Sequence, residues 1–153
     1  MTIDTIPARL LKQAETRPHA TAYAVYTGGG WQKFNWDTFA TNTKQAARAL
    51  LTLGIEAGNP ICIMSFNCPE WVIADVGAMM IGAVPAGIYQ TCSAPEVEYI
   101  LNHSESPVVF LESEEHWEKV AGLWSIKIHG IEPMPLIAKP MWKPLWPWPW
   151  LMI

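Results

Sequence analysis

Short apolar runs alternate with amphipathic stretches along most of this chain. Residues 61–64, 84–89 and 108–111 are β-prone runs, each entered through glycine, proline or asparagine, which predicts three strands. Apolar positions at helical spacing predict helices that begin near residues 6, 36, 68, 94 and 114. Strands that alternate with helices in this way form parallel sheets with right-handed crossovers. We therefore expect an α/β fold with a partial doubly wound, mostly parallel sheet.

The stretch 59–91 has the clearest pattern, which predicts a strand, a helix and a second strand. Asn67 is expected to cap the helix, and Pro69 suits its first turn, where a missing N–H costs nothing. Asp75 is the only charged residue between positions 71 and 80, so this helix should be covered on more than one side. A βαβ unit this apolar is typical of the inside of a parallel sheet.

Residues 21–27 and 31–35 are β-prone and flank three consecutive glycines, Gly28, Gly29 and Gly30, which predicts a β-hairpin. The segment TGGGWQK could also be interpreted as a phosphate-binding loop, because glycines leave backbone N–H groups free to face an anion. It lacks a GKS or GKT ending, and no helix is predicted to begin at the glycines. The hairpin is therefore favoured.

Several helix ends carry the residues that usually cap them. Asn35 is expected to cap a long helix that Gly54 ends, and Ser93 with Glu96 has the spacing of a capping box. Ser113 precedes two glutamates and opens a last helix, which runs to about residue 123.

Composition excludes few classes of protein. The 153 residues carry a net charge of −4 without a basic run, which argues against nucleic acid as a partner. The three cysteines form no CxxC motif and suit a reducing compartment, so a cytoplasmic location is expected. The first 15 residues lack an apolar core typical of a secretory signal, and no apolar run of about 18 residues predicts a membrane span.

A sheet of this kind binds ligands beyond the carboxyl ends of its strands. No G-x-G-x-x-G motif is present there, and no Ser-His-Asp or Cys-His arrangement follows from the spacing. The histidines, at positions 19, 103, 116 and 129, are scattered, and we interpret His116, near Glu112, as a solvated residue at a helix end. The candidate positions at the strand ends are Ser65, Phe66 and Asn67, then Gln90, Thr91 and Cys92, then Glu112 and Ser113.

Two blocks of sequence support a family assignment: TIPARLLKQAETRPHATAYAV, and NPICIMSFNCPEWVIADVGAMMIGAVPAGIYQTCSAPEVEYILNHSESPVVFLE. They resemble the N-terminal part of the adenylate-forming acyl-CoA synthetases, from about residue 6 to residue 123. The segments NCPEW and AGIYQTCSAPEVEYIL look most like the long-chain type called bubblegum.

The resemblance implies activation of a fatty acid by ATP to an acyl-adenylate with release of pyrophosphate, followed by thioester formation with coenzyme A. Magnesium would accompany the ATP. In that family the phosphate loop with its lysine, the adenine and magnesium motif, the ribose aspartate and the C-terminal adenylation lysine all lie downstream. None of these motifs is found here, so the resemblance assigns no catalytic, cofactor-binding or metal residue to any position. We expect the chain to be inactive alone.

Composition changes after about residue 123. Residues 124–153 contain five of the nine tryptophans, counting Trp124, and six of the thirteen prolines, so neither a regular helix nor a central strand is expected across the prolines. We therefore divide the chain into a ligase-like fragment, 1–123, and an irregular tail, 124–153. The bias matches no packing period, which favours an aberrant end, such as a frameshift or intron read-through appended to a truncated gene model. The alternative is a membrane-interfacial anchor on a non-catalytic interaction module, with Lys127, Lys139 and Lys143 facing anionic lipids.

A sheet of three strands would leave an open edge and an uncovered apolar helix face. Aggregation or partial unfolding of the isolated chain is therefore expected. The sequence does not predict an oligomeric state.

Overall fold

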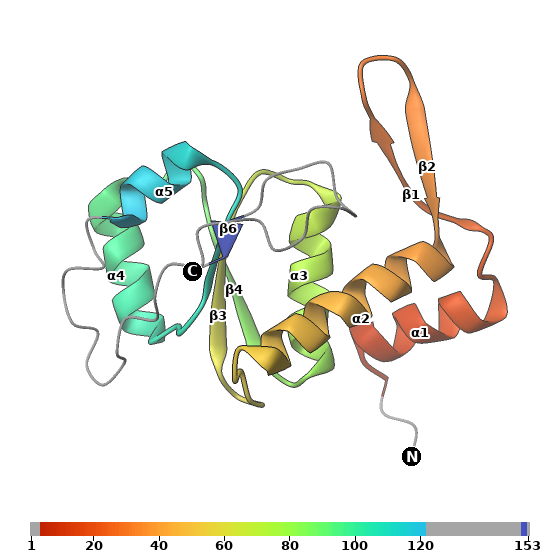
Figure 1. Ribbon diagram of the computed structural model, residues 1–153, viewed down its shortest axis with the longest axis horizontal. Helices are drawn as coiled ribbons and strands as arrows, with labels where there is room; N and C mark the ends of the chain where they lie inside the picture. Colours follow the sequence, from red (N-terminus) through yellow and green to blue (C-terminus); the bar gives the residue numbers. More distant parts are fainter. Residues whose placement is uncertain (1–3, 122–150, 153) are drawn as a thin grey trace. The chain divides into compact units, whose positions relative to one another are not determined.

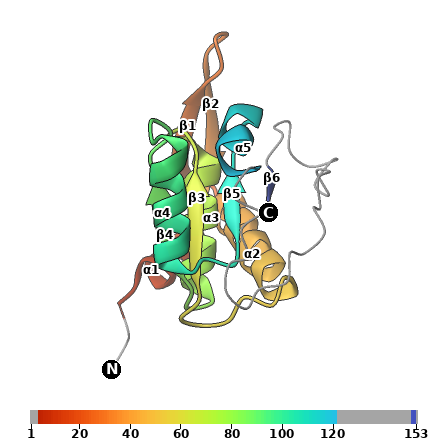
Figure 2. The ribbon, with the colours of Figure 1, turned by 90° about the vertical axis from the view of Figure 1, so that its left-hand side faces the viewer.

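The computed structural model describes residues 4–121 and 151–152, the last two by their backbone only. It divides into two compact units, one formed by Met1–Ala57 with Pro69–Ala83 and the other by Gly58–Cys68 with Val84–Ile153. Figure 1 and Figure 2 together label the elements of both units.

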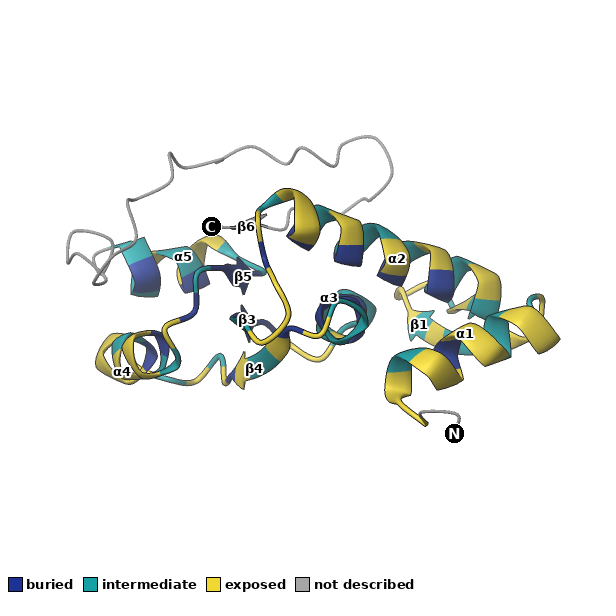
Figure 3. Cartoon of the chain, turned by 90° about the horizontal axis from the view of Figure 1, so that it is seen from below, coloured by how far each residue is buried: buried dark blue, intermediate teal, exposed yellow. Residues whose placement is uncertain are grey.

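The first unit contains three helices and a hairpin. Its elements are α1 (Ile6–Thr16), β1 (Thr21–Tyr26), β2 (Trp31–Asn35), α2 (Trp36–Thr52) and α3 (Pro69–Met80). Helix α2 is amphipathic, with one face buried and the other exposed (Figure 3). Leu10 of α1, Ala40 of α2 and Val76 of α3 meet in one apolar cluster. Each helix therefore contributes an apolar face to the core of this unit.

Helices α2 and α3 approach each other at Gly77. A Cβ atom placed on Gly77 would lie 2.9 Å from Ala46 Cβ and 3.2 Å from the carbonyl oxygen of Thr43. Only glycine leaves room for this contact. Burial also raises the pKa of Asp75, the one charged residue in the middle of α3. The expectation that α3 would be covered on more than one side is confirmed by its buried residues, Ile73, Ala74, Val76, Gly77 and Ala78.

Strands β1 and β2 form the predicted antiparallel hairpin, with Tyr26 opposite Trp31 at its end. Gly28 and Gly30 have positive φ, and the Thr27 N–H donates to the Gly30 carbonyl, 3.1 Å away. No helix begins at these glycines. Of the two interpretations of this segment, the hairpin is therefore confirmed and not the phosphate loop.

The second unit contains a four-stranded sheet and two helices. Its elements are β3 (Pro60–Met64), β4 (Val84–Ile88), α4 (Ala94–Ser104), β5 (Val109–Leu111), α5 (Glu114–Ala121) and β6 (Leu151–Met152). The strand order is β4-β3-β5-β6. Strands β4 and β5 both pair parallel to β3, and β3 and β5 lie side by side in Figure 2. The prediction of an α/β fold with a mostly parallel sheet is confirmed.

Strand β6 was not predicted. It pairs antiparallel with β5, with Leu151 opposite Leu111 and Met152 opposite Phe110, so two residues of the segment expected to be irregular form a strand. Both follow Pro149, the last proline of the chain, and so keep the N–H groups that a ladder requires. The rest of that segment lies outside the described residues.

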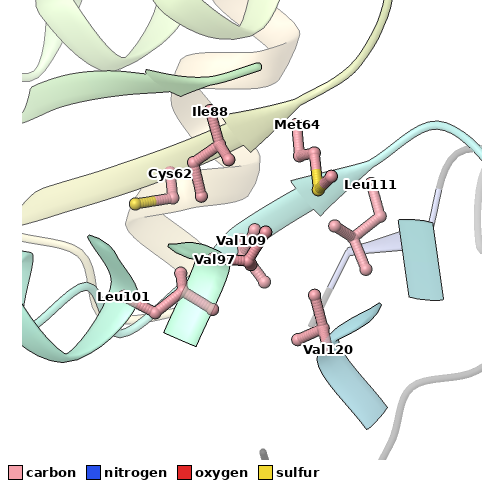
Figure 4. Close-up of a cluster of buried hydrophobic side chains, with 8 residues drawn as sticks. All are labelled: Cys62, Met64, Ile88, Val97, Leu101, Val109, Leu111 and Val120. Carbon is pink, nitrogen blue, oxygen red and sulfur yellow. The ribbon is translucent and has the colours of Figure 1, made fainter. Parts of the chain in front are cut away.

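Strand β3 is the centre of this unit. Ile61, Cys62, Ile63 and Met64 are all 0 % exposed, as expected for a strand covered on both faces. Cys62 and Met64 share one face with residues of β4 and β5 and pack against α4 and α5 (Figure 4). The whole cluster is Cys62, Met64, Ile88, Val97, Leu101, Val109, Leu111 and Val120.

Strand β4 is an edge of the sheet among the described residues. The Val84 N–H donates to the Asn59 carbonyl oxygen, 2.9 Å away, on the side of β3. Backbone groups of a strand alternate in direction, so those of Pro85 and Gly87 face away from β3. Because proline has no N–H, this edge offers one donor fewer than its length suggests.

The predicted helix caps are mostly present. Asn35 Oδ1 accepts a hydrogen bond of 2.8 Å from the Thr38 N–H, and Glu96 Oε2 accepts one of 2.7 Å from the Ser93 N–H. Helix α3 begins at Pro69, so Cys68 precedes it directly, and Asn67 lies one residue too early to occupy the predicted cap position. The prediction placed the start of this helix one residue early.

The capping box of α4 should make stability depend on pH. Hydrogen bonds from the Ser93 hydroxyl and N–H lower the pKa of Glu96 below its usual value. The charged form is therefore favoured in the folded chain, and its stabilising effect is present above the unfolded pKa and lost as pH falls through the folded pKa. Glutamine does not titrate, so we expect Glu96→Gln to remove this contribution to the loss of stability as pH falls. Urea unfolding at pH values from neutral to about 3 would measure it. An unchanged slope of stability against pH would contradict it.

Candidate functional site

The three parallel strands end at one edge of the sheet, where the sequence placed the candidate positions. The loop after β3 meets the residue that follows β5, because the Phe66 N–H donates to Glu112 Oε2 over 2.6 Å. Two of the three predicted loops are thus joined by a direct hydrogen bond.

Ser65 is buried and its hydroxyl is used within its own loop. It donates to the Phe66 carbonyl oxygen, 2.7 Å away, and lies 3.5 Å from Cys68 Sγ. With only 5 % of Ser65 exposed, this hydroxyl closes the turn after β3 and faces no open space. It has the surroundings of a structural residue.

Lys119 of α5 holds the third loop. Its Nζ donates to the Gln90 carbonyl oxygen, 2.7 Å away, and lies 3.8 Å from Glu115 Oε1. No sequence pattern distinguishes Lys119, because a lysine in the last turn of a short helix is an ordinary surface residue. The structure gives it a specific contact with the loop after β4.

His116 corrects the prediction of a solvated histidine, because it is only 2 % exposed. Its N–H donates to Ser113 Oγ over 3.2 Å, and its ring lies 6.0 Å from the Phe66 ring, centroid to centroid. Nδ1 has no hydrogen-bond partner among the described residues. The burial follows from helical spacing, because His116 and the core residue Val120 are four positions apart and share the inner face of α5.

Cys92, another of the predicted strand-end positions, takes part in local structure. The Cys92 N–H donates to the Tyr89 carbonyl oxygen, 3.0 Å away, in the turn after β4, and Cys92 packs partly against the core. None of Cys62, Cys68 and Cys92 forms a disulfide. The strand ends therefore bring together Phe66, Glu112, Ser113 and His116, with Gln90 held separately by Lys119.

The first unit contains a mostly apolar hollow of about 530 Å³. Its polar member, Thr5, uses its hydroxyl to accept a hydrogen bond from the Ala8 N–H at the start of α1. It therefore has no convergent polar groups to orient a substrate. The lining residues are Thr5, Ile6, Pro7, Leu11, Met79, Met80 and Ala83.

Magnesium and ATP do not fit the described residues. Across residues 4–121, no group of three or more His, Cys, Asp or Glu side chains could hold a metal ion. The glycines that could have cradled phosphates form the end of a hairpin, where no helix terminus adds its dipole.

None of the helices in the part of the chain that the structure describes has the length and apolar character needed to cross a bilayer.

Solved structures share this fold. The N-terminal domain of FACL13 from Mycobacterium tuberculosis superimposes with a TM-score of 0.64 and 28 % identity, covering 70 % of this chain and 26 % of that one. A long-chain-fatty-acid CoA ligase described as putative, from Rhodopseudomonas palustris, gives a TM-score of 0.71 at 23 % identity, covering 80 % of this chain and 30 % of that one. The fold is that of the N-terminal domain of the adenylate-forming enzymes.

The chain belongs to the AMP-binding enzyme family, whose sequence profile matches residues 10–135. It is 32 % identical over 123 residues to the long-chain-fatty-acid–CoA ligase heimdall of Drosophila melanogaster, covering 78 % of this chain and 18 % of that one. It is 31 % identical over 118 residues to the human long-chain-fatty-acid–CoA ligase ACSBG2, covering 77 % of this chain and 17 % of that one. The chain thus spans less than a fifth of the length of these two relatives.

Proposed function

We propose that this chain is the N-terminal scaffold of a long-chain fatty acid–CoA ligase of the bubblegum type. The observation that carries the proposal is the similarity to a long-chain-fatty-acid–CoA ligase over 123 residues. The finer assignment is supported by the segments NCPEW and AGIYQTCSAPEVEYIL.

In the full-length enzyme, the fatty acid carboxylate would attack the α-phosphorus of ATP, giving an acyl-adenylate and pyrophosphate. The thiol of coenzyme A would then form the thioester and release AMP, and magnesium would accompany the ATP. The substrates of the full-length protein are thus a fatty acid, ATP and coenzyme A, and we place it in the cytoplasm. This chain supplies the sheet that supports the later parts of the domain.

The isolated chain is inactive under this proposal. The polar groups at its strand ends are used in local contacts, such as those of Ser65 with Phe66 and of Lys119 with Gln90. The chain spans 18 % of the length of the Drosophila ligase.

An ATP–pyrophosphate exchange assay with a long-chain fatty acid tests this proposal. We expect no exchange above the protein-free blank for the chain, and strong exchange for the full-length Drosophila ligase assayed in parallel. Exchange that depends on both the fatty acid and the chain would overturn the inactivity.

A second candidate function is a non-catalytic interaction module with a membrane-interfacial tail. It is favoured by the concentration of tryptophan and proline in residues 124–153, all but two of which lie outside the described residues. Co-sedimentation with liposomes, with and without residues 124–153, separates the two functions. Equal binding by the two chains would contradict a role of residues 124–153 in membrane binding.

A further inference from the structure

The β1–β2 hairpin has an outer face, formed by Ala24, Tyr26, Trp31 and Lys33, that the core does not use. Ala24 lies opposite Lys33, and Tyr26 lies opposite Trp31, so side-chain alternation places these four residues on one face. The Tyr26 and Trp31 rings contact each other at 5.5 Å between centroids, yet the residues remain 60 % and 68 % exposed. Cross-strand contact alone therefore leaves most of this aromatic surface in water.

The opposite face of the hairpin is the one that is anchored. Tyr23 and Phe34 stack at 4.9 Å, and the Tyr23 ring meets Phe39 of α2 edge-on at 5.4 Å. This packing fixes the base of the hairpin on the first unit, while its end extends beyond α1 and α2 (Figure 1). The outer face is thus presented on a supported projection.

The charge of the hairpin differs from that of the chain. Lys33 is the only charged residue between positions 21 and 35, although the chain as a whole is acidic with a net charge of −4. Neither ion pair found among the described residues involves Lys33. The three glycines at the turn add no side chains that would hold the aromatic rings away from a surface.

A tryptophan, a tyrosine and an unpaired lysine on one solvated face match the chemistry of the bilayer interface. Indole and phenol rings have an apolar body and a polar atom, and they concentrate at the level of lipid headgroups. A lysine beside them extends its ammonium toward phosphate while its stem stays in apolar surroundings. An acidic patch on a partner protein would meet only one cation, Lys33, on this face.

We propose that the outer face of the hairpin docks on a lipid surface, with Tyr26 and Trp31 inserted among the headgroups and Lys33 at the phosphates. This docking requires neither ligase activity nor residues 124–153.

Vesicle partitioning of the full chain tests the proposal. With phosphatidylcholine vesicles, alone or mixed with phosphatidylglycerol, Tyr26→Ser/Trp31→Ser should weaken binding by about tenfold. The matched control is Tyr89→Ser/Tyr99→Ser, which removes two tyrosines that are 79 % and 67 % exposed in the other unit and should leave binding unchanged. Equal binding by both double variants, or no binding by the unchanged chain, would overturn the proposal.

A probe at the turn separates docking by the hairpin from docking by any other segment. Gly29 has open space around its Cβ position and no positive φ, so Gly29→Cys should accept an environment-sensitive dye without strain. Cys68→Ala and Cys92→Ala remove the partly exposed thiols, and Cys62 is buried. We expect the dye emission to shift to the blue on vesicles and to be quenched by headgroup nitroxides. A bound chain whose dye stays in water would contradict the proposal. The dye experiment does not depend on the outcome of the exchange assay.

Discussion

Gly77→Val is expected to lower the free energy of unfolding by about 3 kcal/mol. The first added carbon would already lie 2.9 Å from Ala46 Cβ and 3.2 Å from two backbone atoms of α2, so the helices must separate to admit it. Valine adds two methyl groups to this strain. The change would be measured by urea unfolding followed by circular dichroism.

Two other variants isolate the cause. Gly77→Ala introduces the same first contact but gains up to about 1 kcal/mol of helix propensity, so its loss should be clearly smaller than that of valine. Gly29→Ala, at an open position of the hairpin, should stay within about 0.5 kcal/mol of the unchanged chain. If Gly77→Val melted like the unchanged chain, the close approach of α2 and α3 would be wrong.

Leu111→Ala is expected to cost about 3 kcal/mol of stability in the second unit. Leu111 is 0 % exposed and belongs to the cluster that joins the sheet to α4 and α5 (Figure 4). Truncation would remove buried methyl groups and leave a cavity beside Met64 and Val120. The neighbouring side chains are closely packed and could not fill this cavity without strain. Denaturant unfolding would report the loss.

The control for Leu111 is Tyr99→Ala on the outer face of α4. Tyr99 is 67 % exposed, and its ring stacks only on His103 of the same helix. We expect a change of less than about 0.5 kcal/mol. A loss at Tyr99 as large as that at Leu111 would contradict the assignment of the core.

Most of the fold could be predicted because the signals are local. The apolar runs predicted β3, β4 and β5, and the glycines at 28–30 predicted the turn between β1 and β2. Asn35 and Ser93 marked helix starts through hydrogen bonds that span only three residues. Strand β6 was missed because two residues after a proline-rich stretch have no periodicity to detect.

The sequence predicted which loops follow the parallel strands, but not how they contact one another. A ligand site at these strand ends stays a prediction. The bond between the Phe66 N–H and Glu112 joins residues 46 positions apart, so no local pattern could reveal it. His116 was predicted to be exposed to solvent because histidine is polar. It is buried because its helical spacing from Val120 places it on the inner face of α5.

The outward backbone of β4 changes how copies of this chain would associate. A strand that added to this edge would find the carbonyl of Pro85 but no N–H there, leaving Gly87 to donate within the strand. Ordered cross-β growth uses a donor at every second position, so a strand added to this edge would lack one hydrogen bond.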